Sequence, residues 1–337
     1  MFRNDYSDLA AKEVLHALLD AEGEQNLGYG EDMHSLHAAK LIAERFGVPD
    51  ADVHFLAGGT QTNMTVISYF LRPFEGVICC DTGHINVHET AAVEGSGHKV
   101  YTCPNVDGKL RPEDVERAIA LHGDEHMVKL RMVYISDSTE TGTVYSEEEL
   151  LALREVCDRN GLLLFLDGAR LGVALTSRGN DVTPLTIGRL CDVFYVGGTK
   201  NGALFGEAVV IKDKAAGECF RYHIKHKGAM LAKGFVTGLQ FETLFTDDLY
   251  FRLAYHSNCM AERIRSGLDS LGIREVGGST TNQIFLCLPT DSALALMDEF
   301  GCEKWADTDD GTVVRIVTSF ATEPDECDAL LDFLADL

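Results

Sequence analysis

The sequence lacks several features that would mark whole classes of protein. Its 337 residues contain no uninterrupted apolar run of the roughly 18 residues that a membrane span requires. The amino terminus, MFRNDYSDLAAKEV, has neither the basic flank nor the apolar core of a signal peptide. No low-complexity tract interrupts a composition that is 45% hydrophobic. We therefore expect a compact globular protein in the cytoplasm, with no membrane partner.

Positive charge is also scarce. The chain has 29 lysines and arginines against 53 aspartates and glutamates, which gives a formal net charge of -24. Nucleic acids and anionic membranes bind basic patches, so we expect neither as a partner. The ten cysteines are scattered singly apart from Cys79 and Cys80, and they form no CxxC pair and no spacing typical of a zinc site. We expect mostly reduced core cysteines and no metal site.

What the central part of the chain does contain is an alternation of short apolar runs with amphipathic segments. This pattern is typical of an α/β domain with a mainly parallel sheet. The candidate strands are residues 53–57, 77–80, 99–103, 131–136, 161–167, 192–196 and 207–211. Together they predict one large sheet.

The intervening segments have recognisable helix starts. Pro112 occupies a first-turn position in RPEDVERAIALHG, and Ser146 with Glu149 offers a capping box in a helix that Gly161 ends. From about Asp248 a long amphipathic segment precedes a second pattern of strand 282–288, helix 291–301, strand 312–317 and a helix from Pro324. We predict an N-terminal arm and helix (1–30), a large domain (31–247) and a small C-terminal α+β domain (248–337).

A glycine-rich loop follows the first candidate strand. In FLAGGTQTNMTVISYFL, Gly58, Gly59 and Thr60 lie between a strand and a helix, where backbone N–H groups suit a phosphate. The segment lacks the P-loop pattern and the G-x-G-x-x-G of a dinucleotide site. Taken alone, the loop is better explained as a tight turn without a ligand.

Charged residues follow two further strands. Asp167 in FLDGAR ends the most hydrophobic strand, at the edge where open α/β sheets bind ligands, and it is either a partner for a cation or a helix cap. Arg170 could grip a carboxylate through two parallel hydrogen bonds. Lys200 in GGTKNG follows the next strand. It is either a nucleophile toward carbonyls or a lysine that extends to solvent.

Taken together, these residues match what pyridoxal phosphate requires: a phosphate cradle, a carboxylate for the pyridinium nitrogen and a Schiff-base lysine. His84 in DTGHINVHETAAVE begins a predicted helix after strand 77–80, where its imidazole could stack on the pyridine ring. His84 could instead only cap that helix, and His88 is a competing aromatic ring one turn later.

Nine segments carry a resemblance that runs nearly end to end. They are FRNDYSD, GYGED, AGGTQTN, CCDTGHINVHETAA, STETGTVYSEEEL, LDGAR, GGTKNG, KHKGAMLAKGF and RIVTSFAT. The chain resembles the fold-type-I pyridoxal-phosphate enzymes and, among them, the low-specificity L-threonine aldolases and their β-eliminating relatives. The most specific segments are LDGAR and GGTKNG in that order. The resemblance implies the transferase-like fold of type I, with a large seven-stranded domain and a small C-terminal domain.

The resemblance also implies a role for individual residues. Lys200 would be the Schiff-base lysine, Asp167 the pyridinium partner and His84 the stacking and catalytic imidazole. Gly59 and Thr60 would hold the phosphate.

The substrate carboxylate would be held by Arg170 and Arg315, with Asn4 where the family usually has serine. Tyr29 would come from a neighbouring subunit, because these sites form across a dimer interface. The resemblance therefore implies a homodimer, or a tetramer of two such dimers.

The sequence departs from the family pattern at three places. Gly58 stands where many members have serine or asparagine, and Asn4 replaces a serine. Many members also carry a histidine after the fourth strand that contacts the substrate hydroxyl, where STETG offers Thr139 and Glu140. The catalytic base is therefore open.

The function that we expect is retro-aldol cleavage of L-threonine, L-allo-threonine or other β-hydroxy-α-amino acids to glycine and an aldehyde. The alternative is another reaction of the same cofactor and fold: β-elimination, racemisation, transamination or decarboxylation. A binding protein without turnover and a nucleotide-binding protein are further alternatives, and the latter lacks the Walker lysine.

Overall fold

The computed structural model describes residues 1–337 and contains a seven-stranded sheet in the order β1-β7-β6-β5-β4-β2-β3. The strands are β1 (Asp52–Leu56), β2 (Glu75–Cys80), β3 (Val100–Cys103), β4 (Lys129–Ser136), β5 (Leu163–Asp167), β6 (Val193–Gly197) and β7 (Glu207–Ile211). The pairs of β2 with β3, β2 with β4, β4 with β5 and β5 with β6 are parallel, while β7 is antiparallel to β6 and β1. The prediction of seven strands in one mainly parallel sheet is confirmed.

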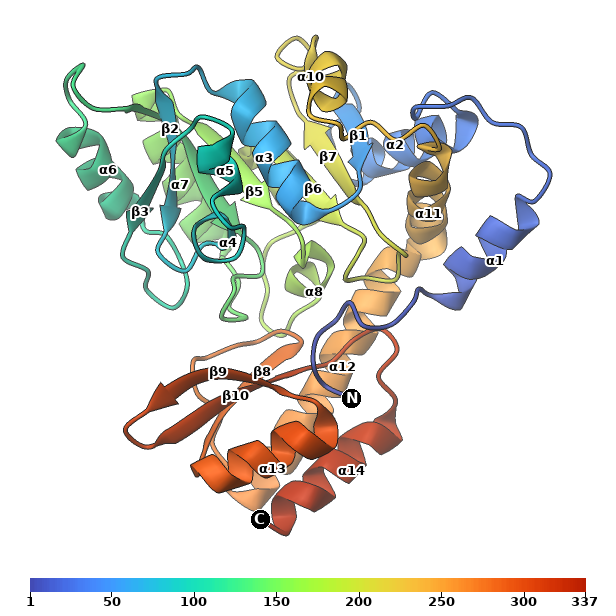
Figure 1. The fold of residues 1–337 in the computed structure, drawn as a ribbon, viewed down its shortest axis with the longest axis vertical. Helices are drawn as coiled ribbons and strands as arrows, with labels where there is room; N and C mark the ends of the chain where they lie inside the picture. Colours follow the sequence, from blue (N-terminus) through green and yellow to red (C-terminus); the bar gives the residue numbers. More distant parts are fainter.

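Helices cover both faces of this sheet (Figure 1). They are α1 (Lys12–Asp20), α2 (Met33–Arg45), α3 (Gly59–Phe70), α4 (His84–Val87), α5 (Ala92–Gly95), α6 (Pro112–Leu121), α7 (Glu147–Asn160), α8 (Leu171–Leu175), α9 (Pro184–Leu190), α10 (Phe220–His226) and α11 (Phe235–Phe245). Alternate residues of β4 belong to different cores: Val133 and Ile135 to one, Met132 and Tyr134 to the other. A strand buried on both faces in this way reads as a continuous apolar run.

A smaller unit follows a short 3-10 helix (Thr246–Asp248), where Asp247 and Asp248 have positive φ values of 51° and 56°. It contains α12 (Leu249–Leu271), β8 (Gln283–Leu288), α13 (Thr290–Phe300), β9 (Glu303–Thr308), β10 (Gly311–Val317) and α14 (Pro324–Ala335). Its antiparallel sheet has the order β8-β10-β9. Strand β9 was not predicted. The positive φ values mark a kink before α12, but Leu249 and Tyr250 at the start of α12 still pack in the core of the large unit, so the boundary at 247/248 stays a prediction.

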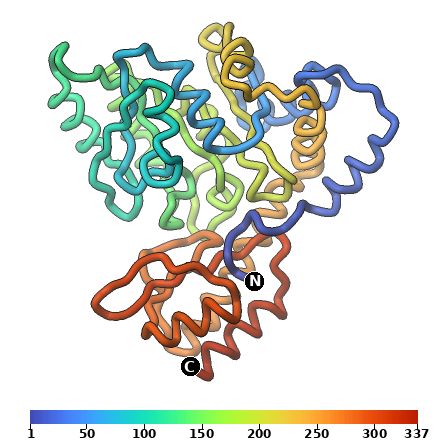
Figure 2. Tube along the Cα trace, in the orientation of Figure 1, coloured from blue at the N-terminus to red at the C-terminus, as the bar shows by residue number.

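The amino terminus lies against this smaller unit, and not only against the large sheet. Phe2 is fully buried in the apolar core of the small unit, and its backbone N–H donates to Phe300 O while Val317 N–H donates to Phe2 O. Figure 2 shows the first residues beside the C-terminal segments before the chain passes to the large unit. The N-terminal arm therefore ties the two units together.

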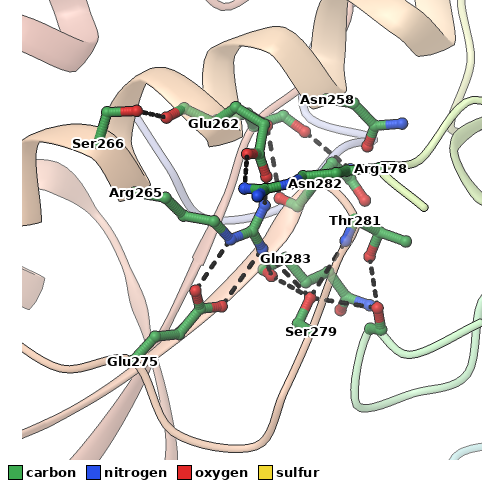
Figure 3. Close-up of polar contacts among 12 residues, drawn as sticks. Arg178, Asn258, Glu262, Arg265, Ser266, Glu275, Ser279, Thr281, Asn282 and Gln283 are labelled. Carbon is green, nitrogen blue, oxygen red and sulfur yellow. Dashed lines mark hydrogen bonds and ion pairs between the residues drawn. The ribbon is translucent and has the colours of Figure 1, made fainter. Parts of the chain in front are cut away.

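Polar contacts fix the small unit against the loop after β4 (Figure 3). Arg265 on α12 donates to Glu275 (Nε–Oε2 2.9 Å) and to the carbonyl of Gln283 (3.0 Å). Ser279 and Thr281 donate to the carbonyl of Gly142 at 3.2 and 3.0 Å. Gly142 has a φ of 78°, and a Cβ there would lie 2.2 Å from Ser279 Oγ, so only glycine fits. The small unit thus holds the loop that carries Glu140.

All ten cysteines are free, and most are buried, as predicted. No helix of the structure combines the length and the apolar character needed to cross a membrane.

Candidate functional site

A cavity of about 560 Å³ opens at the carboxyl ends of β5 and β6 and is bounded on one side by the β9–β10 hairpin of the small unit. Seven of the nine predicted site residues line it: Gly59, Thr60, His84, Asp167, Arg170, Lys200 and Arg315. They come from segments as far apart as residues 59 and 315, so the fold brings them together. Asn4 and Tyr29 do not line it.

The predicted phosphate-binding segment is the start of α3. Gly58 is the N-cap in an extended conformation with no side-chain cap, so the first N–H groups of the helix have no capping side chain. A Cβ on Gly58 would meet no atom within 4 Å, which leaves open space at this helix end. An anion there would meet free donors and the positive end of a 12-residue helix.

Asp167 is the acceptor at the centre of a buried polar network. Its Oδ2 accepts from Tyr134 Oη (2.5 Å) and Asn63 Nδ2 (2.9 Å), and its Oδ1 accepts from Tyr195 Oη (2.5 Å). Burial alone would raise the pKa of Asp167, but the charge of His84 and the tyrosine hydrogen bonds outweigh it and lower the pKa. A carboxylate held ionised in this way is suited to a cationic ring nitrogen.

Sequence reasoning missed the two tyrosines because each lies in an apolar strand and was taken for a core residue. The strand period of two gives a usable signal, since Tyr134 lies two residues before Ser136, and Tyr195 two residues before Gly197 at the strand end. Of these residues, Ser136 and Tyr195 line the cavity, and Tyr134 contacts Asp167.

Lys200 lies in the loop after β6, and its amine has no hydrogen-bond or ion-pair partner. The ring centroid of Tyr6 lies 5.9 Å from Nζ. Burial and the adjacent Arg170 guanidinium lower the pKa of Lys200. An unpaired amine with a lowered pKa is suited to react with a carbonyl group.

Glu207, the first residue of β7, is a further cavity residue that the sequence did not indicate. It is 3% exposed, and its Oε1 accepts from Thr199 Oγ1 (2.9 Å) while its Oε2 has no partner. Burial raises the pKa of Glu207 to about 8, although the Thr199 hydrogen bond and the charge of Lys200 act in the other direction. The cavity therefore holds a carboxyl group that binds its proton more tightly than an exposed glutamate does.

His84 begins α4 and is oriented by Glu89. His84 Nδ1 lies 2.8 Å from Glu89 Oε1, and the same oxygen accepts from Asn63 Nδ2 (2.7 Å). Burial alone would lower the pKa of His84, but the Glu89 hydrogen bond and the charge of Asp167 raise it. The imidazole is thus connected through Glu89 and Asn63 to Asp167.

Arg170 does not present a free guanidinium. Its Nε and Nη2 donate to Asp5 Oδ2 and Oδ1 at 2.7 and 2.9 Å, and Asn282 Nδ2 donates to Asp5 Oδ2 (3.0 Å). The two parallel bonds that we expected toward a substrate carboxylate are therefore made to a carboxylate of the chain itself. Arg315, on β10, has one ion pair, from Nη2 to Glu303 Oε2 (2.5 Å).

The two remaining predicted residues lie outside the cavity. Asn4 is buried, and its Oδ1 accepts from Tyr6 N–H (3.1 Å) and Ser7 Oγ (2.8 Å). Tyr29 is 46% exposed and lies against Arg221 and Lys225, which is 4.6 Å from its ring centroid. Within one chain, Tyr29 does not reach the cavity that holds Lys200.

The structure distinguishes the two residues that replace the expected histidine. Thr139 is 1% exposed and hydrogen bonds to Thr143 Oγ1 (2.8 Å), away from the cavity. Glu140 lines the cavity, and its Oε1 accepts from Ser136 Oγ (2.8 Å) and His84 N–H (3.0 Å). Burial raises the pKa of Glu140.

Comparison with known proteins gives consistent matches along the chain. The family model described as "Beta-eliminating lyase" matches residues 2–290. The low-specificity L-threonine aldolase of a Pseudomonas species is 30% identical over 301 residues, which covers 88% of this chain and 87% of that protein.

Solved structures agree with these sequence matches. The threonine aldolase of Leishmania major superposes with a TM-score of 0.97 at 46% identity, over 99% of this chain and 98% of that one. Aspartate aminotransferase from Thermus thermophilus, at 17% identity and a TM-score of 0.69, covers 98% of this chain and 89% of its own, and shares the fold.

Proposed function

This chain belongs to the β-eliminating lyase family and, within it, to the low-specificity L-threonine aldolases, and on this premise we propose how its residues perform the reaction. The protein is a pyridoxal-phosphate-dependent aldehyde-lyase that cleaves threonine to glycine and an aldehyde. The alternative reactions of this fold are not favoured. The observation that carries the proposal is the juxtaposition of unpaired Lys200 with buried, ionised Asp167 in one cavity.

The cavity fits the cofactor on three separate observations. The uncapped start of α3, at Gly58 to Thr60, offers N–H donors and open space for a phosphate. The pKa of Asp167 is lowered, which favours its carboxylate form, and the pKa of Lys200 is lowered, which favours its neutral amine. When bound, pyridoxal phosphate supplies the electron sink for the pair of electrons that stays on the substrate Cα.

The roles of individual residues are part of the proposal. Lys200 would hold the cofactor through its aldehyde, and Asp167 would keep a proton on the ring nitrogen. Gly59 and Thr60 would bind the phosphate, and the His84 imidazole would stack on the ring. Arg315 binds the substrate carboxylate. Nε and Nη2 of Arg170 are bound to Asp5, so Arg170 contributes its positive charge and its free Nη1.

Cleavage of the Cα–Cβ bond requires a base for the β-hydroxyl proton. We propose Glu140, because it lines the cavity and because its raised pKa makes its carboxylate a better proton acceptor. As the proton of the substrate β-hydroxyl moves to Glu140, the β-hydroxyl oxygen becomes the carbonyl oxygen of the aldehyde. The electron pair of the broken Cα–Cβ bond stays on Cα. A proton then returns to Cα, which gives glycine.

We also propose a homo-oligomer, a dimer or a dimer of dimers, in which Tyr29 enters the neighbour's cavity. Its exposure and its distance from its own cavity support this idea. A cytoplasmic location is proposed as well, supported by ten free cysteines.

A substrate panel tests the function. Purified protein with pyridoxal phosphate is incubated with L-threonine, L-allo-threonine, L-phenylserine and D-threonine, and aldehyde and glycine are measured. We expect equal amounts of both products from one or more of the L-amino acids. Ammonia and a 2-oxo acid as main products would instead indicate β-elimination, and no product from any of the four would contradict the aldolase assignment.

A further inference from the structure

The arginine that we assign to the substrate carboxylate is already bound to a carboxylate of its own chain. Arg315 on β10 stands opposite Glu303 on β9 in the antiparallel register, and Nη2 donates to Glu303 Oε2 (2.5 Å). Both side chains line the cavity that contains Lys200. Glu303 therefore occupies one of the donors that a substrate carboxylate would use.

The surroundings of the pair are unequal. The Arg315 side chain is 14% exposed, its Cζ lies 5.5 Å from the Trp305 ring centroid, and Phe285 packs edge-on against Trp305. The Glu303 side chain is 41% exposed and makes no other side-chain hydrogen bond. Packing thus fixes the arginine, whereas Glu303 is free to turn toward solvent.

Arg315 also has unused capacity. Its Nε is buried and has no acceptor, although a buried guanidinium N–H is normally hydrogen bonded. A carboxylate that took both Nε and Nη2 would satisfy this donor and form the two-bond arrangement typical of arginine. Nη2 has two N–H groups, but a second carboxylate at this nitrogen would lie close to the Glu303 carboxylate and be repelled by it, so the two compete for Arg315.

We propose that Glu303 is an internal stand-in for the substrate carboxylate, holding Arg315 in the unliganded site and yielding it to the amino acid. The inference rests on the proposed role of Arg315 in the aldolase. Because Glu303 competes for the same donor, it weakens apparent substrate affinity by the factor set by the stability of the Glu303–Arg315 pair. For a half-exposed pair that factor is about three- to tenfold.

Two substitutions test the competition. Glu303→Gln keeps the shape and removes the charge, and Glu303→Ala removes the side chain. Each is expected to lower KM for L-threonine about three- to tenfold while kcat stays unchanged, since Glu303 contacts Arg315 and not the reacting atoms. Asp307→Asn is the matched control, because it removes one negative charge from the same strand without touching Arg315.

The single tryptophan of the chain gives a second readout that does not depend on turnover. Trp305 lies against Arg315, so its fluorescence responds when the partner of the guanidinium changes. Glycine has the carboxylate but no β-hydroxyl, so it titrates the loaded enzyme without cleavage. We expect a saturable change in Trp305 emission, with a midpoint about three- to tenfold lower in both Glu303 variants than in wild type and Asp307→Asn.

Arg315→Lys separates this inference from the proposed function. Suppose that Arg315→Lys weakens glycine binding and both Glu303 variants bind glycine like wild type. Then Glu303 does not compete with the substrate, but Arg315 still binds the substrate carboxylate. If Arg315→Lys leaves glycine binding and kcat/KM unaltered, the proposed role of Arg315 itself fails. A visible cofactor band like that of wild type shows that each variant is folded and loaded.

Discussion

Asp167 and Asp137 are two buried carboxyl groups near neighbouring strand ends, and their pKa values are shifted in opposite directions. Burial tends to raise the pKa of Asp167, but the charge of His84 and hydrogen bonds from two tyrosines lower it. Asp137, just after β4, is 1% exposed and accepts one hydrogen bond, from Tyr145 N–H (3.3 Å), so burial raises its pKa to about 7. The number of donors and the nearby positive charge account for the difference.

The raised pKa of Asp137 has a consequence for stability. The folded protein binds this proton more tightly than the unfolded chain, whose carboxyl titrates near 3.8, so the free energy of unfolding falls as pH rises from about 4 to about 7. Asp137→Asn removes that loss. We expect the variant to match wild type near pH 4 and to exceed it by about 2 to 4 kcal/mol near pH 8.

Urea unfolding of the cofactor-free protein at a fixed concentration across this pH range measures the effect. Asp20→Asn, at the exposed end of α1, is the control. We expect it to leave the free energy of unfolding unchanged at both low and high pH. A constant difference between Asp137→Asn and wild type at all pH values would contradict the account.

Among the elements, α7 shows how a helix start is fixed by local chemistry. Ser146 Oγ accepts from Glu149 N–H (3.2 Å), and Glu149 Oε2 accepts from Ser146 N–H (2.8 Å), which confirms the predicted capping box. Gly161 ends the helix with a φ of 61°.

Removing this cap gives a prediction for the element. Ser146→Ala should lower the free energy of unfolding by about 1 kcal/mol, because the Glu149 N–H loses its acceptor. Ser270→Ala, in the exposed last turn of α12, makes the same substitution away from any N-cap and should be nearly neutral. Equal losses in the two variants, measured by urea unfolding, would count against the capping role.

The elements also mark what the sequence could and could not predict. Strands β4 to β6 were predictable because burial on both faces requires continuous apolar runs. Strand β9 was not, because its residues EKWADT are mostly exposed and its position depends on pairing with β10. The same limit applied to the site: Lys200 and Asp167 stood out at strand ends, but the capture of Arg170 by Asp5, 165 residues away, is a tertiary contact without a local signal.

At the scale of the whole molecule, the cavity of one chain lacks Tyr29. If a second subunit supplies it, mixing two inactive or impaired variants should restore activity. A Lys200→Ala chain donates Tyr29 to the site of a Tyr29→Ala chain, so one site in each mixed dimer is complete.

After subunit exchange of equal amounts, we expect about a quarter of wild-type activity, since half of the dimers are mixed and each has one complete site. Unmixed Lys200→Ala protein, which should keep its fold but lose turnover, serves as the baseline. Demonstrated exchange without any recovery would exclude Tyr29 as a residue shared across the interface.

The central claim is that Lys200 carries the cofactor in this cavity. Borohydride reduction of the loaded enzyme, followed by peptide mass spectrometry, locates the lysine to which pyridoxal phosphate was bound. The account predicts the modification on Lys200 alone, together with loss of the visible band and of aldehyde release, and it predicts no modified peptide from Lys200→Ala. A modification on a different lysine, or a visible band that persists in Lys200→Ala, would contradict it.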